Sequence, residues 1–126
     1  MEQITMLKHN EAIQMNTGRL EELYVRLGEA GAEDVVCRAL EELALRLSHT
    51  ERCHSDGRIS DMRKSARSLV AIADQIGMQK LSRVAADVTI SADNHDLVAI
   101  AATLSRLLRI GDSSLSEVWE TKDLSI

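Results

Sequence analysis

The clearest pattern in the chain runs through residues 58–76, which read RISDMRKSARSLVAIADQI. Apolar side chains recur there at alternating steps of three and four, namely at Ile59, Met62, Ala66, Leu69, Ala73 and Ile76. Residues three and four apart share one face of an α-helix, whereas a half-buried strand would alternate every second residue. The pattern therefore predicts an amphipathic helix that packs one stripe against a core.

Weaker copies of this pattern lie on both sides of the predicted helix. Similar steps predict helices over residues 34–50, 78–90 and 95–109, and a shorter apolar helix over residues 20–27. In the segment 95–109 the buried stripe is expected to contain Leu97, Ile100 or Ala101, Leu104, and Leu107 or Leu108. Clusters of glycine, serine, aspartate and asparagine separate the segments at residues 28–31, 55–57, 77, 91–94 and 111–114.

Two of these clusters predict helix ends in detail. Asp93 or Asn94 is suited to cap the start of the helix over 95–109, because its side chain can accept hydrogen bonds from backbone N–H groups. Ser114 and Glu117 have the spacing of a capping box, so a short final turn is expected to restart there. The helix over 95–109 is therefore expected to stop before the cluster at 111–114.

The composition agrees with an all-α chain. Proline is absent and aromatic residues make up 2% of the 126 residues, whereas strands favour aromatic side chains and their turns favour proline. Short connections favour antiparallel neighbours. We expect an antiparallel up-and-down four-helix bundle with an additional N-terminal capping helix. Residues 1–15 are expected to form a helical or frayed N-terminal extension, and 16–126 the bundle domain.

The charge balance and the cysteines indicate the setting. The net charge of −5 argues against nucleic acid as the main partner. No apolar run approaches the roughly 20 residues of a membrane span, and no signal peptide is visible. Cys37 and Cys53 form no paired motif. A cytoplasmic protein with free thiols and no membrane association is the expectation.

Signatures of catalysis are missing from the sequence. The chain lacks phosphate-cradling glycine loops, HExxH, and GxSxG. His49 and Cys53 would share a helix face four residues apart, and His54 follows them, yet two or three ligands make a poor zinc site. We expect no metal, no cofactor and no enzymatic activity.

The segment 65–77, SARSLVAIADQIG, resembles the active helix of histidine-phosphotransfer (HPt) domains of bacterial phosphorelays. The likeness covers residues 16–110 and rests on matches at Ala66, Leu69, Ala73, Ile76, Gly77 and Leu81. In that family a histidine in this helix carries a phosphoryl group, and the surrounding face docks onto receiver domains and histidine kinases. The matched positions are mostly core and turn residues, so the resemblance bears more on fold than on activity.

The departures from the family pattern fall on its chemistry. Arg67 stands at the position of the phosphorylated histidine, Val70 at that of a lysine, and Ala71 at that of a glycine. A guanidinium stays protonated and cannot act as a nucleophile, unlike an imidazole. The resemblance thus implies a non-catalytic, HPt-like signalling protein that docks on a receiver domain or histidine kinase without carrying the phosphoryl group. The expected docking residues are Arg63, Lys64, Arg67, Val70 and Ala71.

Other readings of the sequence stay open. One alternative is that the five expected docking residues form an ordinary solvent-exposed helix face that binds no partner. The apolar content of residues 1–27 favours a helical self-association or scaffold protein, with a homodimer formed through the N-terminal helices. A third hypothesis moves phosphotransfer to His54 or His95, although neither precedes a lysine by one helical turn.

Overall fold

The computed structural model describes the backbone of residues 17–124 and the side chains of residues 18–116. The described part of the chain is all-helical and contains no strand. Its helices are α2 (Thr17–Ser55), α3 (Ile59–Gln75), α4 (Gln79–Asp93) and α5 (Leu97–Leu124). The predicted extension over residues 1–15 lies outside the described residues. No helix in the described part is long and apolar enough to cross a bilayer.

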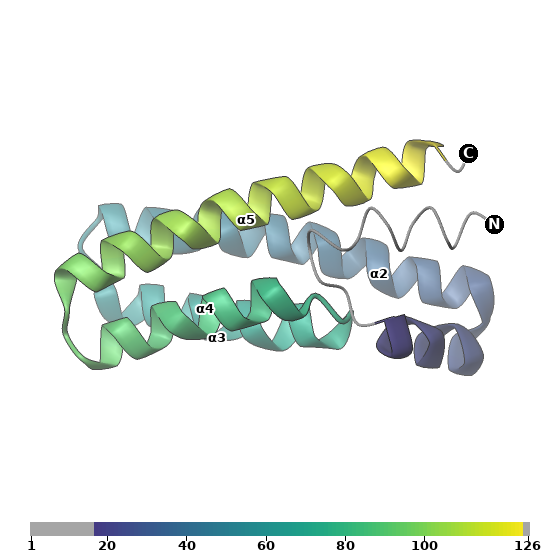
Figure 1. Cartoon of the computed structure of the whole chain (residues 1–126), viewed down its shortest axis with the longest axis horizontal. Coiled ribbons are helices and arrows are strands. Elements are labelled where there is room, and N and C mark those ends of the chain that lie inside the picture. Colours follow the sequence, from purple (N-terminus) through teal and green to yellow (C-terminus); the bar gives the residue numbers. More distant parts are fainter. Residues whose placement is uncertain (1–16, 125–126) are drawn as a thin grey trace.

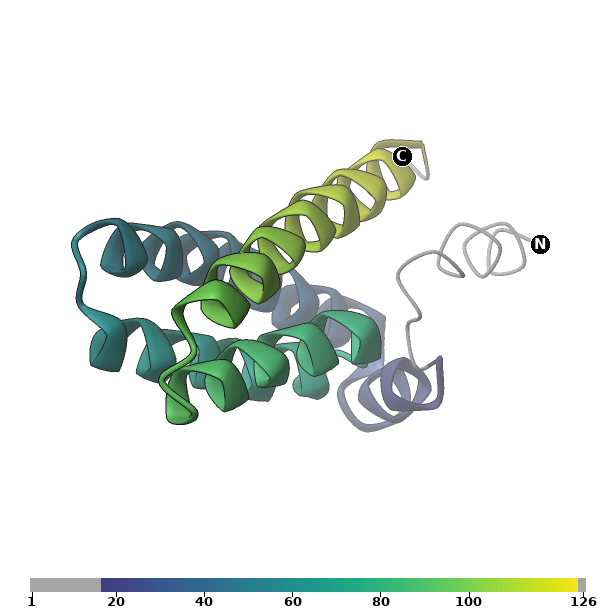
Figure 2. The same cartoon turned by 60° about the vertical axis from the view of Figure 1, so that its left-hand side comes forward.

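A sharp kink divides α2 at Gly28, whose backbone angles are φ 75° and ψ 174°. This conformation is open almost only to glycine, so the residue is suited to break the helix here. The segment before the kink folds beside the C-terminal end of α3, where the Arg19 Nε donates a hydrogen bond to the backbone oxygen of Asp74 over 3.2 Å (Figure 2). Within this segment Leu23 is buried, whereas Tyr24 and Leu27 stay 41% and 46% exposed.

Three tight turns of the same kind join the later helices. After α2, the N–H of Gly57 bonds to the oxygen of His54 and the N–H of Arg58 to that of Cys53, over 3.0 and 2.8 Å. This double hydrogen bond is a Schellman motif, which needs a left-handed residue just past the helix end. Gly57 supplies that residue with φ 76°, and Gly77 supplies it after α3 with φ 78°.

The third turn, after α4, uses a histidine in place of glycine. His95 has φ 53° and is the one non-glycine residue with positive φ in the described chain. Its N–H bonds to the oxygen of Ala92, and the N–H of Asp96 to that of Ser91. His95 is therefore a turn residue that ends α4, which its position in the sequence did not indicate.

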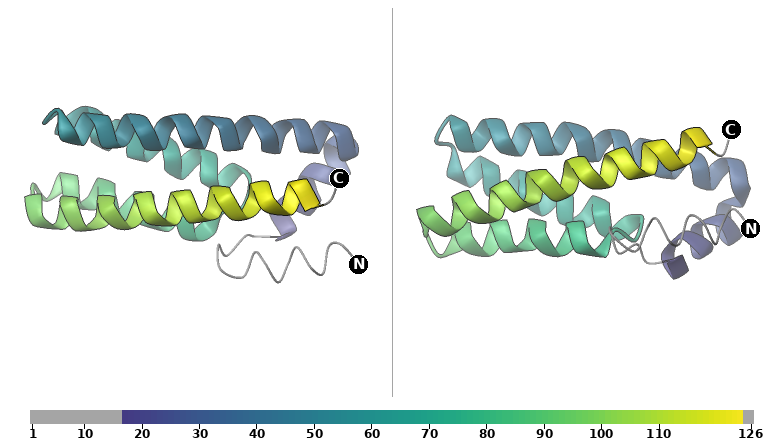
Figure 3. Two further views of the ribbon diagram at one scale, coloured as in Figure 1. Left: turned by 90° about the horizontal axis from the view of Figure 1, so that it is seen from above. Right: turned by 45° about the horizontal axis from the view of Figure 1, so that its top comes forward.

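Consecutive helices pack on one another, α2 on α3, α3 on α4 and α4 on α5, and α5 also contacts α2 (Figure 1). Because each connection is so short, each helix runs back along its predecessor. The longer helices α2 and α5 extend past the ends of α3 and α4 (Figure 3). One core runs through all four helices, and its largest fully buried side chains include Leu40, Leu43, Met62, Leu69, Ile76, Met78, Leu81, Ile100 and Leu107.

The apolar stripe predicted over residues 58–76 is confirmed. Ile59 is half-buried and its other five members, Met62, Ala66, Leu69, Ala73 and Ile76, are fully buried. In α5, the predicted members Ile100, Leu104 and Leu107 are buried, whereas the alternatives Ala101 and Leu108 are exposed and half-buried. Leu97 was placed on the stripe wrongly, because it lies in the first turn beyond the core and is 70% exposed.

The predicted break at residues 111–114 is wrong, because α5 continues to Leu124. Gly111 is buried inside the helix, and a Cβ atom there would lie 2.6 Å from the Cδ1 atom of Leu47 on α2. The glycine thus allows a close approach of two helices and does not end one. Ser114 is buried within α5, so it does not start a new turn.

The predicted N-cap of the last helix, Asp93 or Asn94, is also wrong, because the cap lies two to three residues later. The Asp96 Oδ1 accepts a hydrogen bond from the N–H of Ala99 over 3.0 Å, which makes Asp96 the N-cap. Asp93 is the last residue of α4, and Asn94 follows it in the turn. The helix therefore begins two residues later than the pattern over 95–109 predicts.

Candidate functional site

The outer face of α3 presents Arg67 to solvent near the middle of the helix. Its neighbour Ala66 is fully buried in the core. A step of one residue on a helix turns the side chain by about 100°, which is enough to point the next residue outward. Lys64 and Ala71, three residues before and four after Arg67, are exposed on the same face.

Arg63 faces α4, where it binds Asp93. Its Nε and one terminal nitrogen donate hydrogen bonds to the two carboxylate oxygens of Asp93, the second over 3.3 Å. A bidentate guanidinium–carboxylate pair is geometrically specific, although an exposed pair contributes little to stability. Arg63 is therefore engaged within the molecule, and Asp93 is a member of this face that the sequence did not reveal.

The same contact changes the acidity of Asp93. The hydrogen bond from Arg63 holds the pKa of the Asp93 carboxyl below its usual value, and weaker electrostatic effects of His95 and Arg67 act in the same direction. The hydrogen bond to Asp93 correspondingly raises the pKa of Arg63. Asp93 is therefore held by Arg63, and Arg67 has only a weaker electrostatic effect on it.

Val70, one of the expected docking residues, is less exposed than its neighbour Ala71. It is half-buried, packs against the core, and its backbone oxygen accepts a long hydrogen bond of 3.5 Å from the hydroxyl of Ser82 on α4. Of the five predicted docking residues, Lys64, Arg67 and Ala71 are exposed, whereas Arg63 and Val70 are half-buried toward α4.

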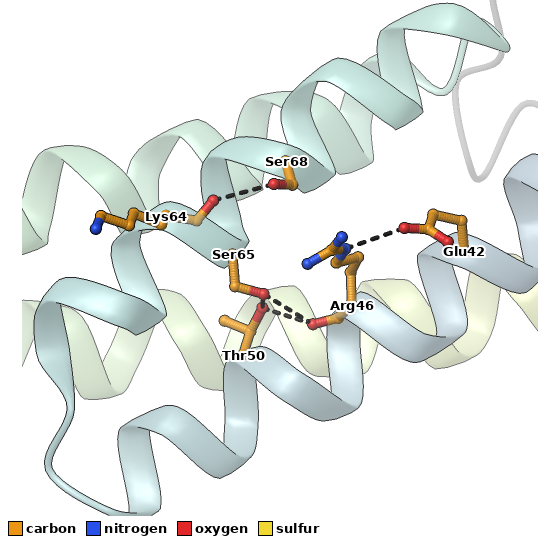
Figure 4. Close-up of polar contacts among 6 residues, drawn as sticks. All are labelled: Glu42, Arg46, Thr50, Lys64, Ser65 and Ser68. Carbon is orange, nitrogen blue, oxygen red and sulfur yellow. Dashed lines mark hydrogen bonds and ion pairs between the residues drawn. The ribbon is translucent and has the colours of Figure 1, made fainter.

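A buried polar contact joins α2 and α3, on the side of α3 that faces α2 (Figure 4). The Thr50 hydroxyl donates to the backbone oxygen of Arg46 over 2.6 Å. The Ser65 hydroxyl lies 2.7 Å from the Thr50 oxygen and 3.3 Å from the oxygen of Arg46. Both hydroxyls donate to the Arg46 oxygen, and either one can be the donor in the contact between them. These contacts satisfy both buried groups and set how α3 lies on α2.

An open hollow of about 260 Å³ lies above this contact, between α2 and α3. Its lining residues are Arg46, His49, Arg58, Asp61, Lys64, Ser65 and Ser68. Arg46 bonds through its Nε to the carboxylate of Glu42 over 3.1 Å. Arg58 lies within 3.3 Å of Asp56 and 3.5 Å of Asp61. The sequence singled out only His49 and Lys64 of this set, because nothing in a helical period shows which residues face each other across two helices.

The histidine and cysteine side chains at the end of α2 do not gather into a metal site. The Sγ of Cys53, which is fully buried, lies 3.5 Å from the Nε2 of His49. His54 is half-buried in the last turn of α2. Among the residues that the structure describes, no group of three or more histidine, cysteine, aspartate or glutamate side chains could hold a metal ion.

Comparison of the chain with protein-family models, with curated proteins and with solved structures finds no match.

Proposed function

We propose that the chain folds as a four-helix bundle like that of HPt domains, with residues 17–27 as an additional N-terminal capping helix. We propose further that it docks on a receiver domain or histidine kinase without carrying a phosphoryl group. The observation that carries this proposal is the exposure of Arg67 in the middle of α3. At the corresponding place the family that α3 resembles carries its phosphorylated histidine. The lengths of α3 and α4, 17 and 15 residues, and the short turns between them agree with it.

The chemistry of the face supports binding and not transfer. A guanidinium has five N–H donors and stays protonated, so it can form paired hydrogen bonds to carboxylates but cannot attack a phosphoryl group. Lys64 adds a second exposed positive charge one turn before Arg67, and the small side chain of Ala71 one turn after it lets a partner approach the helix closely. A receiver domain suits this face because its phosphorylation pocket is acidic.

A binding titration against the receiver domains and histidine kinases of the same cell tests the docking proposal. One receiver or kinase is expected to bind, and Arg67→Glu is expected to weaken that binding by about tenfold or more, because it opposes like charges across the interface. Arg106→Glu is the matched control, since it makes the same charge change on an exposed position of α5. The proposal fails if no partner binds at high micromolar concentration, or if both variants weaken binding equally.

A phosphorylation assay tests the proposal that the chain carries no phosphoryl group. Incubation with an active kinase or a phosphorylated receiver is expected to leave no acid-labile label on the chain. Label that disappears in His54→Gln or in His95→Gln would show that another histidine carries the phosphoryl group. The chain would then be an active phosphotransfer protein with a displaced site.

A second candidate function is self-association through the N-terminal helices. Near the kink, Val25 is 87% exposed, and Tyr24 and Leu27 are also exposed. Exposed apolar side chains that lie together favour contact with another protein. The mass in solution of the full chain and of a chain that lacks residues 1–15 tests self-association. A dimer that becomes a monomer on deletion would favour self-association, and a monomer in both forms would exclude it.

A further inference from the structure

Three of the seven residues that line the hollow between α2 and α3 are cationic. The net charge of the chain is −5, yet the lining contains Arg46, Arg58 and Lys64 against the single carboxylate of Asp61. His49 adds an imidazole at the same place. Glu42 and Asp56, which pair with Arg46 and Arg58, lie outside the lining. The concave surface itself therefore presents more cations than anions to a ligand.

Each of the three cations keeps N–H groups with which to bind a ligand. The ion pair of Arg46 with Glu42 runs through the Nε, so it does not use the terminal nitrogens of the guanidinium. Figure 4 shows this guanidinium in the space between α2 and α3. Lys64 forms no ion pair with any residue that the structure describes. Arg58 is held by two exposed carboxylates at 3.3 and 3.5 Å, and pairs of this kind exchange partners at little cost.

The size of the hollow selects among anions. Its volume of about 260 Å³ lies below the roughly 300–1,000 Å³ of pockets that hold cofactor-sized ligands. The hollow therefore has room for a single phosphate group, and the rest of a larger ligand would extend out of it into solvent. The hydroxyl of Ser68 stands on the wall, where it donates to the backbone oxygen of Lys64 over 3.2 Å. We infer that the hollow binds the phosphate group of a small phosphate compound through Arg46, Arg58 and Lys64.

This inference does not depend on the proposed docking function, because Arg67 is not part of the lining. Lys64 is shared by the two proposals, since it belongs both to the docking face and to the lining of the hollow. Asp61 is the one lining residue that opposes an anion, so its charge gives the inference a test in which binding becomes tighter. Since the Asp61 side chain is 49% exposed, replacing it with asparagine leaves the core untouched.

Titration of the full chain with inorganic phosphate, and in a second arm with glycerol phosphate, tests the inference by NMR. Ionic strength is kept constant with sodium chloride. We expect saturable shifts of the amide signals near residues 46–49 and 58–68. Saturation by glycerol phosphate is the expected result. Saturation by inorganic phosphate alone would show that the hollow does not accept a phosphate carried on a small molecule, and would overturn the inference.

Variants then separate a site from general charge attraction. Lys64→Gln is expected to weaken phosphate binding by about fivefold or more, since it removes one charged donor. Asp61→Asn is expected to tighten it, and Arg83→Gln on α4, which removes the same charge from an exposed position outside the lining, to leave it unchanged. Shifts that never saturate, an equal loss in Arg83→Gln, or no gain in Asp61→Asn would each overturn the inference.

Discussion

Gly111 offers a sharp test of how α5 packs on α2. A Cβ atom at this position would lie 2.6 Å from Cδ1, 3.0 Å from Cδ2 and 3.4 Å from Cγ of Leu47. Carbon atoms in contact prefer about 3.5–4.0 Å, so either the leucine must change its conformation or α5 must move. Leu47 is only 5% exposed and has little room to move.

Two opposing effects set the result of Gly111→Ala. Alanine inside a helix is favoured over glycine by about 1 kcal/mol, whereas overpacking a core costs about 1–3 kcal/mol. We therefore expect a net loss of about 0–2 kcal/mol in the free energy of unfolding. In a Leu47→Ala background the clashing atoms are absent, and Gly111→Ala is expected to stabilise the protein by about 1 kcal/mol.

The assay is urea unfolding, monitored by circular dichroism at 222 nm. It compares the unchanged chain, Gly111→Ala, Leu47→Ala and the double variant. Leu47→Ala alone is expected to cost about 2–5 kcal/mol, and the cycle should give a coupling of about 1–3 kcal/mol between the two positions. If the helix instead ended at Gly111 with a positive φ, alanine would cost about 1–2 kcal/mol in both backgrounds. A loss independent of Leu47, or a gain in both backgrounds, would refute the packing argument.

Three further expectations follow from the turn between α4 and α5 and from the contact beside it. Asp96→Ala should lower the free energy of unfolding by about 1 kcal/mol because α5 loses its N-cap, whereas Asn94→Ala should change it by less, as measured by urea unfolding. His95→Gly should raise the free energy of unfolding by about 1 kcal/mol, because glycine adopts a positive φ without strain; an unchanged or lower melting temperature would contradict this. Asp93 should titrate below the usual pKa of an aspartate in a carbon-detected NMR titration, and Arg63→Gln should return that pKa toward its usual value. Since the pKa of Asp93 is lowered in the folded state, the stabilisation from this pair is complete above the usual pKa of aspartate. It is lost as the pH falls through the lowered value. Identical NMR titration curves of Asp93 with and without Arg63 would exclude the contact as the cause.

The sequence predicted the faces of single helices well, because burial follows the helical period. The stripe over residues 58–76 and the exposure of Arg67 both depend on that period alone. The glycines were harder to interpret, since Gly57 and Gly77 end helices whereas Gly111 lies inside one. A usable signal was present, because Leu104, Leu107, Gly111 and Leu115 continue the helical spacing through the glycine, in steps of three, four and four. A glycine on an uninterrupted apolar stripe indicates close packing of helices, not a helix end.

Contacts between helices could not be predicted in the same way. Residues 63 and 93 lie 30 positions apart, and the period of α3 does not show how α4 is rotated about its own axis. The side chains three residues apart at Lys64 and Arg67 differ in direction by about 60° on a helix. In the structure Lys64 also lines the hollow toward α2, whereas Arg67 is not part of that lining. Lys64 therefore borders two surfaces. One is the exposed face of α3, where Arg67 lies one turn later, and the other is the hollow, where a ligand at Lys64 meets Arg46 and Arg58.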